Sequence, residues 1–178
     1  MCNWLSDRME QYPNWINLIW FSDEAHLHLN SAINNHSNIF WWVEPPEITE
    51  RYLKGPKITW FCAFNARWGT LGPYWFENDN SRMVTINGKC YQAVLQKFHY
   101  DRAQKVTPNQ LSMTWFMQDG ASPHTAGDTI TFLQQLFRNH LVALGIIHDW
   151  APHSPDLNPL DYWFWEAAKG SVYTNHPG

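Results

Sequence analysis

The sequence contains no long apolar run, and its first residues do not form a leader. No stretch of about 18 uninterrupted apolar residues occurs, which is roughly the length of a membrane-spanning helix. The N-terminal stretch MCNWLSDRMEQYP lacks the basic and then apolar segments that are typical of a signal peptide. We therefore expect a soluble, intracellular protein.

Cysteine is scarce as well. The chain has three cysteines, Cys2, Cys62 and Cys90, and no Cys-x-x-Cys pair. An odd number in this pattern supports neither a disulfide framework nor a zinc finger. We expect all three to be reduced thiols in the core.

Internal repeats and low-complexity tracts are also missing, which argues against solenoids and propellers. Apolar side chains are plentiful: 44% of the 178 residues are hydrophobic, and 12 are tryptophan. We expect these tryptophans in the core, including Trp41, Trp42, Trp163 and Trp165. The length corresponds to about one domain, so we expect a single domain over residues 1–178.

Charge is distributed unevenly along the chain, although the formal net charge is only −4. Residues 1–50 and 111–178 are acidic, whereas residues 51–110 carry most of the lysines and arginines. A basic middle third that folds onto one face could neutralise phosphates, while the acids hold a divalent cation. The alternative is a basic stretch that is merely solvated.

The residue patterns predict strands first and then helices that alternate with strands. The expected strands are 17–29, 38–43, 57–64, 71–76, 114–117 and 146–150, with a hairpin through 30–38. The expected helices are 87–105, 122–144 and a last one that begins near Pro159. This order predicts an α/β fold with a mixed sheet and flanking helices, and it is the element order of the ribonuclease H-like fold.

Three acids occupy places where a carboxylate is costly or conspicuous. Asp23 lies inside an apolar strand, where alternation places it on the face of Ile19 and Phe21. Asp119 follows a buried strand at its carboxyl end, where α/β sheets gather ligands. Asp161 falls in the first turn of the last helix.

Each acid also has a plain structural explanation. Asp23 could bond to backbone amides at a frayed strand end, and Asp119 could form an Asx turn with Gly120. Asp161 could be present because the helix dipole favours a negative charge in the first turn. Their conjunction favours a site for Mg²⁺ or a similar hard cation, because such ions take oxygen ligands. A pair of these ions promotes in-line phosphodiester chemistry.

Three ordered blocks carry a specific resemblance: IWFSDEAH at 19–26, QDGASPHTA at 118–126 and SPDLNPLDY at 154–162. Together with LGPYWF at 71–76 and VTINGKCY at 84–91, they resemble the catalytic domain of mariner-superfamily DDE/D transposases. The resemblance covers nearly the whole chain. It implies a ribonuclease H-like fold in a fragment that lacks the N-terminal helix-turn-helix domains and is truncated at its C-terminal end.

The resemblance also implies the chemistry. Asp23, Asp119 and Asp161 would be the catalytic acids and would bind two Mg²⁺ or Mn²⁺ ions, with Asp156 as the competing candidate for the third place. The substrate would be double-stranded DNA at terminal inverted repeats, with insertion at TA. A homodimer of the full-length protein and a nuclear location are further implications. Without the domains that select sequence, the isolated chain is expected to bind metal weakly and to cut DNA nonspecifically.

Other polar residues suggest DNA contacts or a different metal. The candidates for phosphate contact are Lys89, Lys97, Arg102, Lys105 and His124. His26 and His28 share a strand face with Glu24, as in a zinc hydrolase, but no third histidine follows at ligand spacing. A catalytically inactive, domesticated transposase-derived DNA-binding module is the second functional hypothesis, and a generic ribonuclease H is the third.

Overall fold

A computed structural model describes residues 2–28, 57–77 and 84–174, in which five strands form one mixed sheet. The strand order is β3-β2-β1-β4-β5. The strands are β1 (Ile19–His28), β2 (Lys57–Asn65), β3 (Gly69–Trp75), β4 (Trp115–Met117) and β5 (Leu141–Val142). The expected strand 38–43, the hairpin 30–38 and Trp41 and Trp42 lie outside the described residues.

The first three strands are antiparallel neighbours, and the last two run parallel to β1. The register pairs Phe21 with Phe64 and Asp23 with Cys62 across β1 and β2. On its other edge β1 pairs with β4, from Ile19 opposite Trp115 to Phe21 opposite Met117. The Ser22 hydroxyl adds a bond of 2.8 Å to the Met117 carbonyl. The antiparallel start and the later parallel strands confirm the predicted mixed sheet.

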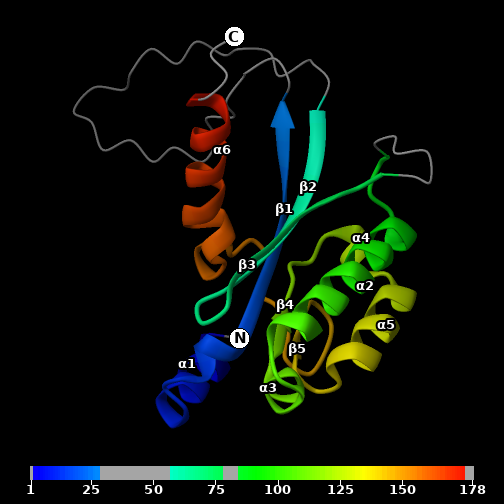
Figure 1. The fold of residues 1–178 in the computed structure, drawn as a ribbon. Helices are drawn as coiled ribbons and strands as arrows, with labels where there is room; N and C mark the ends of the chain where they lie inside the picture. The colour runs from blue at the N-terminus through cyan, green and yellow to red at the C-terminus, as the bar shows by residue number, and fades with distance from the viewer. Residues whose placement is uncertain (1, 29–56, 78–83, 175–178) are drawn as a thin grey trace.

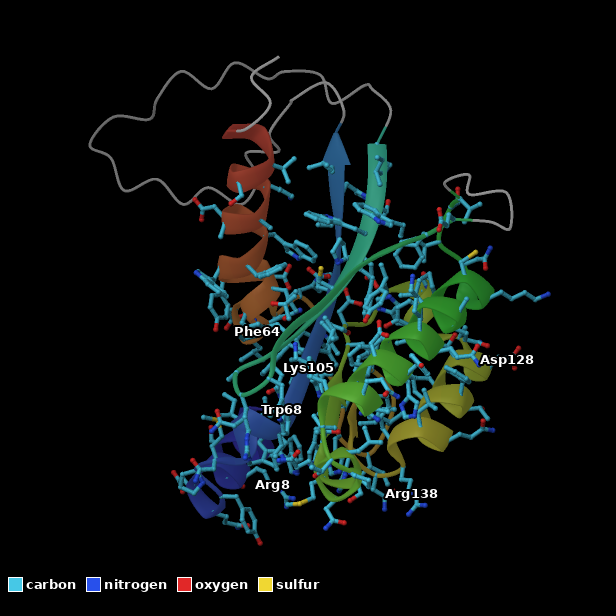
Figure 2. All side chains as sticks on the ribbon, viewed as in Figure 1. Arg8, Phe64, Trp68, Lys105, Asp128 and Arg138 are labelled. Carbon is cyan, nitrogen blue, oxygen red and sulfur yellow. The ribbon has the colours of Figure 1, made fainter. Side chains whose placement is uncertain are left out.

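Helices cover both faces of this sheet (Figure 1). Helix α2 (Gly88–Lys105) and helix α5 (Gly127–Phe137) pack on one face, where the core contains Trp20, Phe61 and Phe116. Helix α6 (Trp165–Thr174) packs on the other face, against Ile19 and Phe21. Helix α1 (Cys2–Gln11) and the 3₁₀ turn η1 (Trp15–Leu18) lead into β1 on that second face. Side chains fill the space between these layers (Figure 2).

Local sequence signals explain where the middle helices begin. The Asn87 side chain caps α2 by accepting a hydrogen bond from the Cys90 N–H. Thr107 and Gln110 form a capping box at the start of α3 (Pro108–Met113). The predicted helix 87–105 is therefore confirmed, with Asn87 as its cap.

The expected helix 122–144 and the expected strand 146–150 were wrong. The segment contains a short helix α4 (Ser122–Thr125), a break at Ala126, helix α5 and then β5. Arg138 adopts a positive φ of 54° and ends α5, so Leu141 and Val142 pair with β4 instead. Residues 146–150 contribute only an isolated bridge at Asp149, whose carboxylate accepts the Gly145 N–H at 2.7 Å.

The last helical region begins irregularly. A 3₁₀ turn, η3 (Pro155–Leu157), precedes a π-helical turn, η4 (Leu160–Phe164), which runs into α6. Asn158 fixes the start: its amide donates to the Ser22 carbonyl at 3.1 Å and its oxygen accepts the Leu160 N–H at 3.2 Å. This bond ties η4 to β1 beside Asp23.

Two expectations about core residues need correction or restriction. Trp165 is buried as expected, whereas Trp163 is 53% exposed and touches Phe64 at its ring edge. Cys62 is a buried free thiol and Cys90 a partly buried one, while the Cys2 side chain lies outside the described set. Among the described residues, no helix combines the length and apolarity needed to cross a bilayer.

Candidate active site

Asp23 lies on the α6 side of β1, on the same face as Ile19, Phe21 and Ala25. Its Oδ2 accepts a hydrogen bond from the Trp165 Nε1–H at 2.5 Å. Burial is the main cause of a strongly raised pKa of Asp23, and the charges of Asp161 and Glu24 add to it. The carboxyl group therefore holds a proton to higher pH than an ordinary aspartate.

Asp161 enters the same site from the first turn of η4. Burial raises its pKa, a hydrogen bond with the Asp23 side chain opposes that rise, and the charge of Asp119 adds to it. The fold thus brings Asp161 to Asp23, and Asp161 also interacts with Asp119, although the three acids are far apart in sequence. Asp156, the competing candidate, is exposed in the preceding 3₁₀ turn.

Asp119 follows β4 and faces partly outward, with 43% of its side chain exposed. Its Oδ1 accepts the Ala121 N–H at 3.0 Å and a bond from His124 Nδ1 at 2.5 Å. Burial opposes ionisation, but the bonds and the charge of His124 outweigh it and lower the pKa of Asp119. The predicted Asx turn is therefore present, and the charge of Asp119 also acts on Asp161.

His124 lies between two carboxylates. Its Nε2 is 3.3 Å from Oε2 of Glu24, and its ring stacks on Tyr91 with centroids 4.1 Å apart. Burial lowers its pKa, but Glu24 and Asp119 together raise it to about 10. Because both neighbours are acceptors, both ring nitrogens donate when the ring is protonated.

Sequence reasoning missed the part played by Glu24. Strand alternation places Glu24 on the face opposite Asp23, so the prediction grouped it with His26 and His28. In the structure the Glu24 side chain reaches His124, and its Oε1 is buried without a hydrogen-bond partner. His26 instead bonds to Thr59 at 2.8 Å. The adjacency of Glu24 to Asp23 was the available signal.

Of the five candidates for phosphate contact, two are buried. Arg102 is 1% exposed and lies over the Phe137 ring at 4.1 Å, and it bonds to Thr114 at 3.2 Å. His124 is 3% exposed. Lys89, Lys97 and Lys105 are exposed on α2. Burial removes Arg102 and His124 from the set that DNA could reach, so the lysines alone remain candidates.

The donor chemistry fits a hard divalent cation. Within the described ranges, no set of three or more His, Cys, Asp and Glu side chains is arranged to hold one ion together. Mg²⁺ typically needs only one or two carboxylates, because water and substrate phosphates complete its shell. The raised pKa values of Asp23 and Asp161 show that the surroundings disfavour the ionised carboxylates, and a bound cation would stabilise those ionised forms. The unpartnered Glu24 Oε1 is a further oxygen that a cation could satisfy.

Solved structures with the same fold are transposases. The chain matches a pre-cleavage Mos1 transpososome with a TM-score of 0.66 and 18% identity, over 96% of this chain and 47% of that one. It matches the Mos1 transposase catalytic domain with raltegravir and Mg at 0.59 and 19%, over 96% and 68%. It also matches the Mos1 strand transfer complex at 0.64 and 19%, over 96% and 45%.

These likenesses establish the fold: a five-stranded mixed sheet with flanking helices, of the ribonuclease H-like class. The chain spans about half the length of the transposase chains in the DNA complexes that it matches. No family model and no curated protein matches the sequence.

Proposed function

We propose that this chain is the catalytic domain of a metal-dependent DNA transposase of the mariner type. It would hydrolyse phosphodiester bonds at the ends of a mobile element and transfer the cut strand into target DNA. The observation that carries the proposal is the convergence of Asp23 and Asp161, with Asp119 interacting with Asp161, on a ribonuclease H-like sheet.

In this proposal Asp23, Asp119 and Asp161 would hold two Mg²⁺ or Mn²⁺ ions. When bound, such ions activate the attacking oxygen and stabilise the leaving oxygen of an in-line phosphoryl transfer. Solved structures of the Mos1 transposase catalytic domain with Mn and of the Mos1 paired-end complex with Mg support this choice of metal.

The chain's own residues would orient the acids for that chemistry. Trp165 holds one oxygen of Asp23 by its indole N–H. Asn158 anchors the turn that carries Asp161 to the carbonyl of Ser22, the neighbour of Asp23. Fixed ligands lower the reorganisation that the reaction requires.

The proposed substrate is double-stranded DNA with terminal inverted repeats and a TA target, and a homodimer in the nucleus is proposed for the whole protein. The similar fold of Mos1 transposase in paired-end complexes, one of them with the left transposon end, supports a DNA substrate. Lys89, Lys97 and Lys105 are exposed and are the proposed phosphate contacts.

The experiment is cleavage of supercoiled plasmid DNA by the purified chain with Mn²⁺ and with EDTA. We expect Mn²⁺-dependent nicking by the wild-type chain. The nicking rate of Asp23→Asn and of Asp161→Asn should be at least about 100-fold lower, because the loss of one group that stabilises the transition state typically costs about that much in rate. Asp128→Asn is the matched control, because Asp128 is an exposed acid in the first turn of α5.

Three results would count against the proposal. Full activity in Asp23→Asn would remove the acid site from the mechanism. Loss of nicking in Asp156→Asn with activity kept in Asp161→Asn would move the third ligand to Asp156. DNA binding without any nicking in the wild-type chain would favour the binding module over the enzyme.

A further inference from the structure

The two oxygens of the Asp119 carboxylate have different surroundings. Oδ1 accepts two hydrogen bonds, from the Ala121 N–H at 3.0 Å and from His124 Nδ1 at 2.5 Å. No donor among residues 2–28, 57–77 and 84–174 bonds to Oδ2. The Asp119 side chain is 43% exposed, which means that solvent reaches this carboxylate.

His124 is itself held from several directions. Its ring stacks on Tyr91, and its Nε2 meets Glu24 Oε2 at 3.3 Å. Its backbone carbonyl accepts a bond from the Gln118 amide at 3.0 Å, and the Gln118 oxygen accepts the Tyr91 hydroxyl at 2.9 Å. With 3% of the residue exposed, the ring cannot turn without breaking this packing.

We propose that His124 is a positioning residue, which fixes Oδ1 of Asp119 and thereby presents Oδ2 alone as a ligand to a divalent cation. For the identity of the cation this inference rests on the proposed function. Hydrogen bonds to a ligating group fix its orientation before the ion arrives, and their loss typically lowers metal affinity. Asp119 would therefore be a ligand through one oxygen.

A different role would use the same histidine only to join α4 to β1 through Glu24. Two substitutions separate these roles, because each one keeps a nitrogen at the position of only one of the two ring nitrogens of His124. The amide nitrogen of His124→Asn takes the place of Nδ1 and preserves the bond to Asp119. The longer His124→Gln places its amide near the position of Nε2, next to Glu24, and gives up the bond to Asp119.

The test is a titration of the metal-free chain with Mn²⁺ alone. Calorimetry measures the binding, and the electron spin resonance signal of free Mn²⁺ measures it independently. We expect His124→Asn to bind within about threefold of wild type and His124→Gln to bind about 10–100-fold more weakly. Equal losses in both variants, or wild-type affinity in His124→Gln, would overturn the proposal. Urea unfolding of His124→Asn and of His124→Gln shows whether each variant is folded.

A second measurement needs no variant. A crystal structure of the wild-type chain with Mn²⁺ should place Oδ2 of Asp119 on the ion and Oδ1 on His124. Coordination through Oδ1, or through both oxygens, would overturn the positioning role while leaving the proposed function intact. A wild-type chain that binds no Mn²⁺ would contradict the proposed function and, with it, the presentation of Oδ2 to a cation.

Discussion

Asp23 is a carboxylate in surroundings that disfavour its ionised form. Apolar neighbours on β1 and the nearby Asp161 make the charge costly, and the hydrogen bonds from the Trp165 indole and the Glu24 backbone offset only part of that cost. A residue kept for function in this way is expected to lower the stability of the metal-free fold.

The first prediction at this scale is that Asp23→Asn stabilises the metal-free chain. Because the folded-state pKa of Asp23 is raised, its contribution to the free energy of unfolding is complete below about pH 3.8 and is lost as pH rises through the folded pKa. Asparagine stays uncharged as the pH rises, and its amide oxygen can still accept the hydrogen bond from Trp165. We expect a gain on the order of 1–3 kcal/mol at pH 7.5 that shrinks toward pH 4.

Urea unfolding in EDTA at several pH values measures this difference. His124 lowers the stability of both proteins in parallel at alkaline pH, because its raised pKa of about 10 makes its contribution complete below pH 6.5 and lost toward pH 10. Asp128→Asn, at an exposed site, should show no comparable gain. A mutant at position 23 that is less stable than wild type at pH 7.5 would contradict the prediction.

Individual residues differ in how far the sequence could identify them. Asp23 and Asp119 stood out because strand alternation and a strand end make their positions costly or exposed to ligands. Strand parity separated Glu24 from Asp23, so nothing in the pattern indicated that α4 would bring His124 against Glu24. Contacts between side chains on different elements depend on how the elements pack, and that packing cannot be predicted from residue patterns in a single sequence.

At the scale of elements, the sequence predicted those whose signals are local and failed where pairing decides. Helix α2 carries its own cap and its apolar spacing, and it was found almost to the residue. The stretch 122–144 contains enough apolar residues for one long helix, but the parallel pairing of Leu141 and Val142 with β4 ends it early. A two-residue strand has no periodicity of its own to reveal it.

Helix α2 also supports the second prediction, which concerns the contact with DNA. Lys89 lies in its first turn, two residues before Tyr91, which packs on His124. Arg138 ends α5, which puts it at the opposite end of that helix from Asp128 (Figure 2). Gln92, three residues after Lys89, bonds to Thr129 near the start of α5 at 3.3 Å. The 11 residues of α5 rise about 16 Å, so Lys89 and Arg138 lie in different regions of the surface.

We therefore expect Lys89→Gln to weaken binding of double-stranded DNA at all sequences and to reduce the slope of log K against log salt by about 1. Arg138→Gln removes the same charge and is expected to leave that slope unchanged. Fluorescence anisotropy of a labelled duplex at several salt concentrations between about 50 and 200 mM measures both slopes. Equal slopes for wild type and Lys89→Gln would exclude Lys89 from the phosphate contacts.

At the scale of the whole molecule, element order was sufficient for the fold. Antiparallel strands followed by helices that alternate with strands leave few ways to build one sheet with both faces covered. The structure has that sheet, with β1 in the centre and an acid site where β1, the end of β4 and η4 meet. Three elements from distant parts of the chain therefore contribute to one place.

The last prediction follows from this convergence. Because the acids meet only in the folded chain, a divalent cation that binds them stabilises the fold by mass action, by about 2.7 kcal/mol at 100 times its dissociation constant. Mn²⁺ should therefore raise the Tm of the wild-type chain, EDTA should reverse the shift, and Asp161→Asn should lose most of it. Asp156→Asn, an exposed acid five residues earlier, should keep it. Differential scanning calorimetry over a Mn²⁺ series measures the shift. An equal rise of Tm in Asp161→Asn would mean that the ion binds elsewhere.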